Sequence, residues 1–92
     1  MRVSIVYRKG GPNLGAAKAN LDEALAALDM SDTPVELVRV ESEQDAERAR
    51  MHGSPTVLID GTDPFAPANA PTTLSGRPYG APTVEELIEA LA

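Results

Sequence analysis

The first forty residues alternate between strand and helix patterns, and this order constrains the fold more than any other feature of the chain. Arg2–Tyr7 contains three β-branched residues and predicts a strand, which ends before the glycines and proline of Gly10–Pro12. Leucines and alanines then recur at three- and four-residue steps as far as Asp29, as on the apolar face of a helix. Val35–Val40 predicts a second strand. A strand, a helix and a strand in this order predict a right-handed parallel β-α-β unit.

The turn that joins the first strand to the helix has the sequence GGPNL, residues 10–14. Gly11 is an acceptable N-cap residue, and Pro12 suits the first helical position because that position needs no backbone N–H. We therefore expect the helix to begin at Pro12. Its N-terminus would offer unpaired N–H groups and a partial positive charge, which suit an anion.

Residues 42–60 predict a short helix, a turn and a third strand. Ser42 suits the N-cap of a charged helix that ends near Met51. The sequence HGS, residues 52–54, predicts a turn. Pro55–Asp60 predicts a strand, since a proline at the first strand position costs no ladder hydrogen bond.

The C-terminal third predicts a long loop, a fourth strand and a closing helix. Thr62–Thr72 is rich in Pro and Ala without periodicity, so it is either a lid over the turn or a mobile segment. Thr73–Tyr79 predicts a short strand, and Thr83 with Glu86 matches a capping box before an apolar helix face. Residues 1–92 thus predict one α/β domain of order β-α-β-α-β-β-α, a four-stranded mixed sheet flanked by three helices.

The chain has no cysteine, and this excludes several classes of chemistry. Without a thiol there is no disulfide, thiolate metal site, cysteine nucleophile or dithiol exchange. His52 is the only histidine, and we expect a surface or capping role for it, because no nucleophile is arranged beside it. No clustered carboxylates accompany it, so the sequence predicts neither a metal site nor a cofactor.

The formal net charge of −6 argues against a general nucleic-acid binder, because that function needs a surplus of basic side chains. The apolar run before Arg8 and Lys9 is too short for a signal peptide. No segment approaches the roughly 20 apolar residues of a membrane span. We therefore expect a cytoplasmic protein with neither a nucleic-acid partner nor a membrane partner.

Three short stretches, in this order and spacing, point to a known family. They are GGPNL at Gly10–Leu14, GSPTV at Gly53–Val57 and TVEEL at Thr83–Leu87. Together they resemble small bacterial thioredoxin-fold proteins, a thioredoxin-family or alkylmercury-lyase-like group with a G-C-P-N-C turn. The resemblance spreads over most of the chain and implies a thioredoxin-like fold. It also implies that Pro55 is a cis-proline that faces the turn.

The chain departs from this family at the residues that carry its chemistry. Gly11 stands at the position of the nucleophilic cysteine and Leu14 at that of its resolving partner. A third cysteine that such proteins carry in an S-C-R segment is replaced by Gly76, before Arg77. The resemblance therefore implies no catalytic residue here and no thiol–disulfide exchange or mercury chemistry.

We expect a redox-inactive binding or interaction module that uses the face of the former active site. Its ligand would be a peptide, a protein or a small anion. Arg8, Lys9 and Arg77, which the resemblance places near the turn, are either part of a basic rim or ordinary solvated charges. The expected site residues are Gly10, Gly11, Pro12, Asn13, Leu14, Ser54, Pro55 and Arg77.

Three alternatives stay open at this stage. The Gly10–Leu14 turn is either a retained site or a plain helix-capping turn left after the chemistry was lost. A thiol-dependent oxidoreductase or transferase would take its sulfur from an external thiol such as glutathione. A structural subunit would instead assemble through an exposed strand edge or helix face, and the sequence leaves the oligomeric state open.

Overall fold

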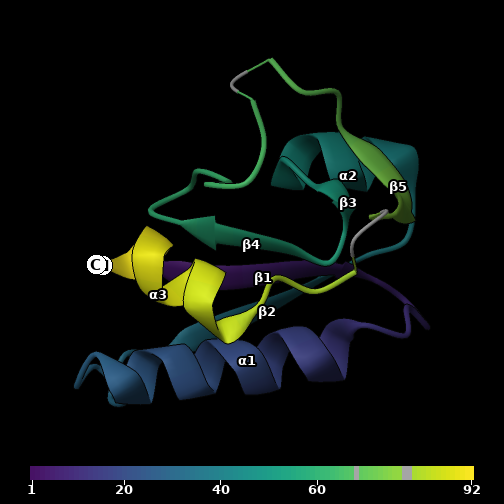
Figure 1. Ribbon diagram of the computed structural model, residues 1–92. Helices are drawn as coiled ribbons and strands as arrows, with labels where there is room; N and C mark the ends of the chain where they lie inside the picture. The colour runs from purple at the N-terminus through teal and green to yellow at the C-terminus, as the bar shows by residue number, and fades with distance from the viewer. Residues whose placement is uncertain (68, 78–79) are drawn as a thin grey trace.

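The computed structural model describes residues 1–67, 69–77 and 80–92, and the chain forms a mixed α/β structure with three helices within them (Figure 1). In chain order the elements are β1 (Val3–Arg8), α1 (Leu14–Ala27), β2 (Val35–Val40), α2 (Glu43–Ala49), β3 (His52–Ser54), β4 (Thr56–Ile59), β5 (Thr73–Gly76) and α3 (Val84–Leu91). None of the helices in these residues is long and apolar enough to span a bilayer.

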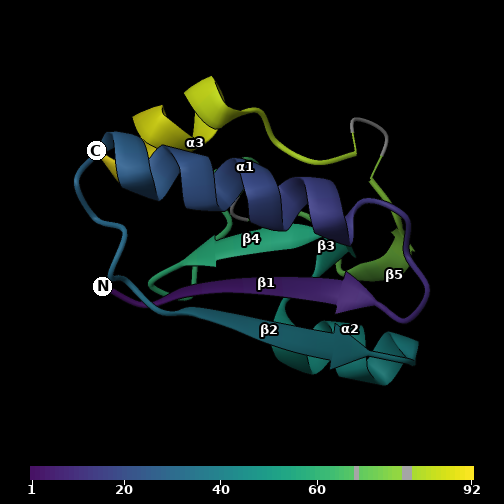
Figure 2. The same cartoon turned by 90° about the horizontal axis from the view of Figure 1, so that it is seen from below.

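The main sheet has the strand order β2-β1-β4, with β1 at its centre. β1 runs parallel to β2 in one continuous register, from Val3 beside Val35 to Arg8 beside Val40. This is the parallel pairing that the strand-helix-strand pattern predicts. β4 runs antiparallel to β1, with Ile59 beside Val3. Helices α1 and α3 lie on one face of this sheet and α2 on the other (Figures 1 and 2).

Side-chain alternation along β1 divides the core into two clusters, because successive residues of a strand point to opposite faces. Val3 and Ile5 pack under α1 and α3 with a cluster that includes Leu21 and Leu25 of α1. Val6 points the other way and packs with a smaller cluster under α2, which is completed by Val40, Ala46, Met51 and Leu58. The larger cluster holds α1, β1, β4 and α3 together.

The expected single four-stranded sheet is instead divided into two sheets. β5 pairs with β3 in parallel, as a separate two-stranded sheet, and not with β4 in a hairpin. The long connection explains the difference, because parallel partners need a crossover of about a dozen residues or more, and residues 55–72 provide it. Thr73 N donates to Met51 O at 2.9 Å and Arg77 N donates to Ser54 O at 3.1 Å.

The expected turn at residues 52–54 is therefore wrong, since these residues form β3. Glycine and the following proline suggested a turn, but the partner strand β5 overrides this local signal. The strand expected at Thr73–Tyr79 ends at Gly76, and Pro78 and Tyr79 lie outside the described residues.

The expected start of α1 is also wrong, because Asn13 is the N-cap and the helix begins at Leu14. Gly10 adopts φ +75° and Gly11 N donates to Arg8 O at 2.9 Å, so the chain first completes a tight turn. Ala17 N then donates to Asn13 O at 3.0 Å. Gly11 and Pro12 belong to this turn rather than to the helix.

Two other helix starts agree with the sequence prediction. Ser42 Oγ accepts a hydrogen bond from Asp45 N at 3.1 Å and caps α2. At α3, Thr83 Oγ1 accepts from Glu86 N at 3.1 Å, and Glu86 Oε1 accepts from Thr83 N at 2.9 Å. The capping box is confirmed.

Candidate functional site

The turn after β1 lies directly against the end of β3. Arg8 N donates to Ser54 Oγ at 2.9 Å across 46 residues of sequence. A Cβ placed on Gly11 would lie 3.2 Å from Ser54 Oγ and 3.1 Å from Arg8 O, which is tighter than ordinary contact. The glycine thus lets the backbone approach Ser54 closely. The Ser54–Pro55 peptide bond that follows is cis.

The other turn residues have distinct surroundings. Pro12 is exposed, and a Cβ placed on Gly10 would meet no atom within 4 Å. The side chain of Asn13 caps no backbone group of α1, and a Cβ placed on Gly80 would lie 3.2 Å from Asn13 Nδ2. Leu14 is half-buried and packs against the larger core cluster. Leu14 is therefore a packing residue, and Asn13 lies beside Gly80 in the segment that precedes α3.

Arg77 connects this region to the loop after β4. Its backbone pairs with Ser54, and its side chain passes over Gly53, where an added Cβ would lie 2.6 Å from Arg77 Cγ. Arg77 Nη1 donates to Asp63 Oδ2 at 2.7 Å. The side chains are 15% and 1% exposed, respectively, so the ion pair is almost fully buried. The guanidinium that was expected on a basic rim is engaged by Asp63.

Sequence reasoning missed Asp63 as a partner of Arg77. The carboxylate also accepts a hydrogen bond from Phe65 N at 2.8 Å through Oδ1, so both of its oxygens are used. The sequence signal for this partner was an acidic residue in a loop that is otherwise rich in proline and alanine. The burial of the Asp63 carboxylate depends on its contact with Arg77, which lies 14 residues further along the chain. Lys9, another of the expected cations, pairs with Glu41 at 3.8 Å, and both side chains are exposed.

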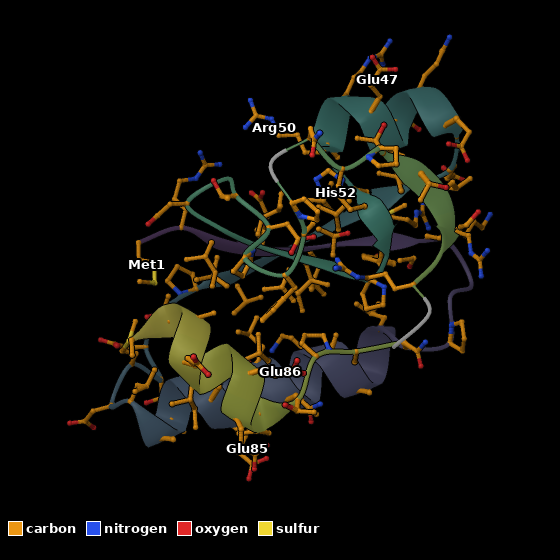
Figure 3. All side chains as sticks on the ribbon, turned by 45° about the horizontal axis from the view of Figure 1, so that its top comes forward. Met1, Glu47, Arg50, His52, Glu85 and Glu86 are labelled. Carbon is orange, nitrogen blue, oxygen red and sulfur yellow. The ribbon has the colours of Figure 1, made fainter. Side chains whose placement is uncertain are left out.

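Pro55 and Arg77 line a pocket of about 650 Å³ between the loop after β4 and the segment that leads into α3. Most of its wall is apolar, and a ligand would meet Pro55, Val57, Phe65, Pro71, Ala81 and Pro82. Polar groups stand at intervals, with His52 on β3 and Glu86 on α3 at opposite sides (Figure 3). The volume falls in the range of small-ligand pockets, roughly 300–1,000 Å³.

His52 contacts the far end of the loop. Its Nδ1 lies 3.2 Å from Pro71 O, and because a carbonyl oxygen only accepts, this nitrogen carries the hydrogen. Its backbone N donates to Thr56 Oγ1 at 2.9 Å, and Thr56 Oγ1 donates to Gly53 O at 2.6 Å. Within the described part of the chain, no three His, Asp or Glu side chains gather where they could hold a metal ion.

The eight expected site residues fall into two groups. Gly10–Leu14 and Ser54 belong to the region where the turn after β1 meets the end of β3, whereas Pro55 and Arg77 line the pocket. The two groups adjoin at the Ser54–Pro55 peptide bond, and Asn13 lies beside Gly80, which also lines the pocket. A scan of family models, a search of curated proteins and a search of solved structures each gave no match.

Proposed function

We propose that this chain is a cysteine-free, redox-inactive, thioredoxin-like binding module, and that its ligand occupies the pocket beside Pro55. The observation that carries the proposal is the pocket of about 650 Å³ that Pro55 and Arg77 line together. The parallel β1-α1-β2 unit, the antiparallel β4 and the contact of Gly11 with Ser54 support the family resemblance.

The lining of the pocket favours an apolar ligand over an anion. Pro55, Phe65 and Pro82 are apolar, and burying apolar surface is worth about 25 cal/mol per Å². The one guanidinium at the site is paired with Asp63 at 2.7 Å, and Glu86 adds a negative charge. An anion would therefore meet little net positive charge. The proposed ligand is an extended peptide of a partner protein, which places apolar side chains in the pocket.

A titration followed by amide chemical shifts tests this proposal. The ¹⁵N-labelled protein is titrated with three blocked peptides of equal length, whose central residues are aliphatic, acidic or basic. We expect the aliphatic peptide to shift the amides of Val57, Phe65 and Thr83, because these residues line the pocket. Shifts confined to residues outside the pocket, or an equal response to all three peptides, would contradict the proposal.

A pair of tryptophan variants localises the binding. Ala66→Trp places an indole at the pocket wall, so we expect it to block the peptide. Ala19→Trp makes the same change on an exposed position of α1 that does not line the pocket. The control should bind like the parent protein. Equal loss of binding in both variants would remove the pocket as the site.

An enzyme assay separates the external-thiol alternative from the binding module. With glutathione as the thiol, reduction of a disulfide substrate is followed with and without the protein. We expect no rate above the thiol-only background, because the chain supplies no sulfur nucleophile. A rate above background that Ala66→Trp abolishes would replace the binding module with a thiol-dependent enzyme.

A further inference from the structure

The chain begins a second hairpin strand after β4 and stops it after one residue pair. Asp60 and Gly61 have φ +52° and +83°, as in a two-residue hairpin turn of type I′. Ile59 N donates to Thr62 O at 2.9 Å, and Thr62 N donates to Ile59 O at 3.1 Å. These two bonds form on the edge of β4 that faces away from β1.

Pro64 prevents the hairpin from continuing. With Ile59 opposite Thr62, the next pair that could exchange two hydrogen bonds is Val57 with Pro64. A proline has no N–H, so it cannot donate to Val57 O. Asp63 instead turns its carboxylate toward Arg77, whose Nη1 donates to Oδ2 at 2.7 Å. In the described part of the chain, β1 is therefore the only strand beside β4.

Val57 is left with an N–H and a C=O that point away from β1. Asp60 N donates to Arg2 O, at the start of β1, at 2.7 Å, whereas Ile59 N donates outward to Thr62 O, so alternate residues of β4 face opposite sides. Val57 faces the side of Ile59. Among the described residues, no hydrogen bond to either Val57 group is found. Val57 is 1% exposed, and buried backbone groups are nearly always paired, so this pair of groups indicates a partner from outside the chain.

The two unpaired groups match the main chain of a peptide. Val57 lines the pocket, and a strand that enters the pocket about 4.8 Å from β4 supplies one C=O and one N–H to it. The backbone before Pro55 offers no such pair, because Ser54 O already accepts from Arg77 N at 3.1 Å. An extended segment of a partner protein therefore fits this edge of the sheet.

The walls of the pocket select the side chains of such a segment. Residues directly opposite on neighbouring strands share a face, so the ligand residue beside Val57 projects to the face of α1 and α3. Phe65 and Ala81 pack on this face and line the pocket, which favours an aliphatic side chain. Ligand residues two positions away share the face. Because Arg77 is paired with Asp63, the charge of Glu86 in the pocket favours a basic residue there.

We propose that an extended segment of a partner protein pairs with β4 at Val57, in the place of the missing hairpin strand. The segment carries an aliphatic residue beside Val57 and a basic residue two positions away, near Glu86. The three-stranded sheet then gains a fourth strand at its β4 border, opposite the border formed by β2 (Figure 2). This inference rests on the proposed function and adds to it the main-chain pairing and the sequence preference of the ligand.

An N-methyl scan tests the main-chain pairing. The aliphatic peptide of the titration above is prepared with one N-methyl group at each residue in turn, which removes one N–H donor at a time. Only the N–H that bonds to Val57 O should matter, so one position should lose roughly tenfold or more in affinity and its two neighbours less than about threefold. A flat scan with a parent peptide that binds the pocket overturns the strand pairing and leaves the binding module standing. A parent peptide that does not bind overturns both.

Nuclear Overhauser contacts locate the pairing on the protein. In the complex, backbone protons of the peptide should lie close to the amide proton of Val57. Contacts to the backbone of β5 and none to β4 would overturn the proposal. Shifts of the β4 amides when the free protein is concentrated would also overturn it, because they would assign this edge to a second copy.

Glu86→Gln tests the preference for a basic residue. Glutamine keeps an oxygen that can accept from Thr83 N, so the helix cap is retained. Peptides with lysine two positions before and after the aliphatic residue should bind about two- to fivefold tighter than peptides with glutamate there, and the variant should lose this difference. Glu85→Gln is the matched control, because Glu85 is exposed on α3 and points away from the pocket (Figure 3). Equal binding of the two peptides, or an equal loss in the control, would overturn the preference.

Discussion

The buried ion pair between Arg77 and Asp63 allows a sharp stability prediction. Replacing Arg77 with methionine keeps the apolar stem over Gly53 but leaves the Asp63 carboxylate, which is 1% exposed, without its cation. Removing one partner of a buried pair typically costs about 3–5 kcal/mol. Asp63 keeps its hydrogen bond from Phe65 N, so we expect the lower end, about 3 kcal/mol. A chain of this length has a stability of roughly 5–14 kcal/mol, so the loss is a large fraction of the total.

Urea unfolding followed by far-ultraviolet circular dichroism measures this cost. With a urea m-value of about 1 kcal/mol/M, a loss of 3 kcal/mol lowers the midpoint by about 3 M. Lys18→Met is the matched control, because Lys18 Nζ pairs with Asp22 Oδ2 at 2.6 Å but both side chains are well exposed. An exposed i,i+4 pair contributes only about 0.3–0.5 kcal/mol.

A double variant distinguishes an unpaired charge from lost packing. Adding Asp63→Asn to Arg77→Met removes the stranded charge and keeps a side-chain oxygen that can accept from Phe65 N, so the double variant should be more stable than Arg77→Met by about 1 kcal/mol or more. If Arg77→Met costs no more than Lys18→Met, the buried pair does not hold the loop. If the second substitution gives no recovery, the cost comes from packing and not from the unpaired charge.

Three further substitutions test individual contacts by the same urea assay. Gly53→Ala should cost about 2 kcal/mol or more, because Gly53 has φ +103° and the added Cβ would lie 2.6 Å from Arg77 Cγ; a neutral result would contradict the close approach. Gly15→Ala should stabilise the protein by about 0.5–1 kcal/mol, because alanine has the higher helix propensity and its Cβ at this position of α1 would meet no other atom within 4 Å. A lower urea midpoint would contradict this prediction. Thr83→Ala should cost about 1 kcal/mol, since it removes the hydroxyl that accepts from Glu86 N, and an unchanged midpoint would show that the cap adds no stability.

The helices and the two long strands could be predicted because their signals are local. The valine-rich run Val35–Val40 and the capping residues Ser42 and Thr83 act within a few positions, and the structure places them as expected. The Gly10–Pro12 turn was located correctly but not the helix start, because a proline after a glycine fits both the first helical turn and a preceding tight turn.

The second sheet and the buried pair could not be predicted from local patterns. β3 is three residues long and exists because β5 hydrogen-bonds to it from beyond the long loop. Likewise, nothing near Asp63 in the sequence indicates that Arg77 reaches it, and nothing near Gly53 indicates that the arginine stem passes over it. Each of these features is a pairing between distant segments, and only tertiary structure decides such pairings.

The bonds around the pocket indicate that its walls are formed before a ligand arrives. The loop after β4 is tied near its start by Asp63 to Arg77 and near its end by Pro71 O to His52. The opposite wall is tied by Asn20 Nδ2, which donates to Pro82 O at 2.9 Å. A ligand that enters a preformed pocket loses less free energy to ordering the protein. The turn after β1 leads directly into α1, the helix whose Asn20 holds Pro82.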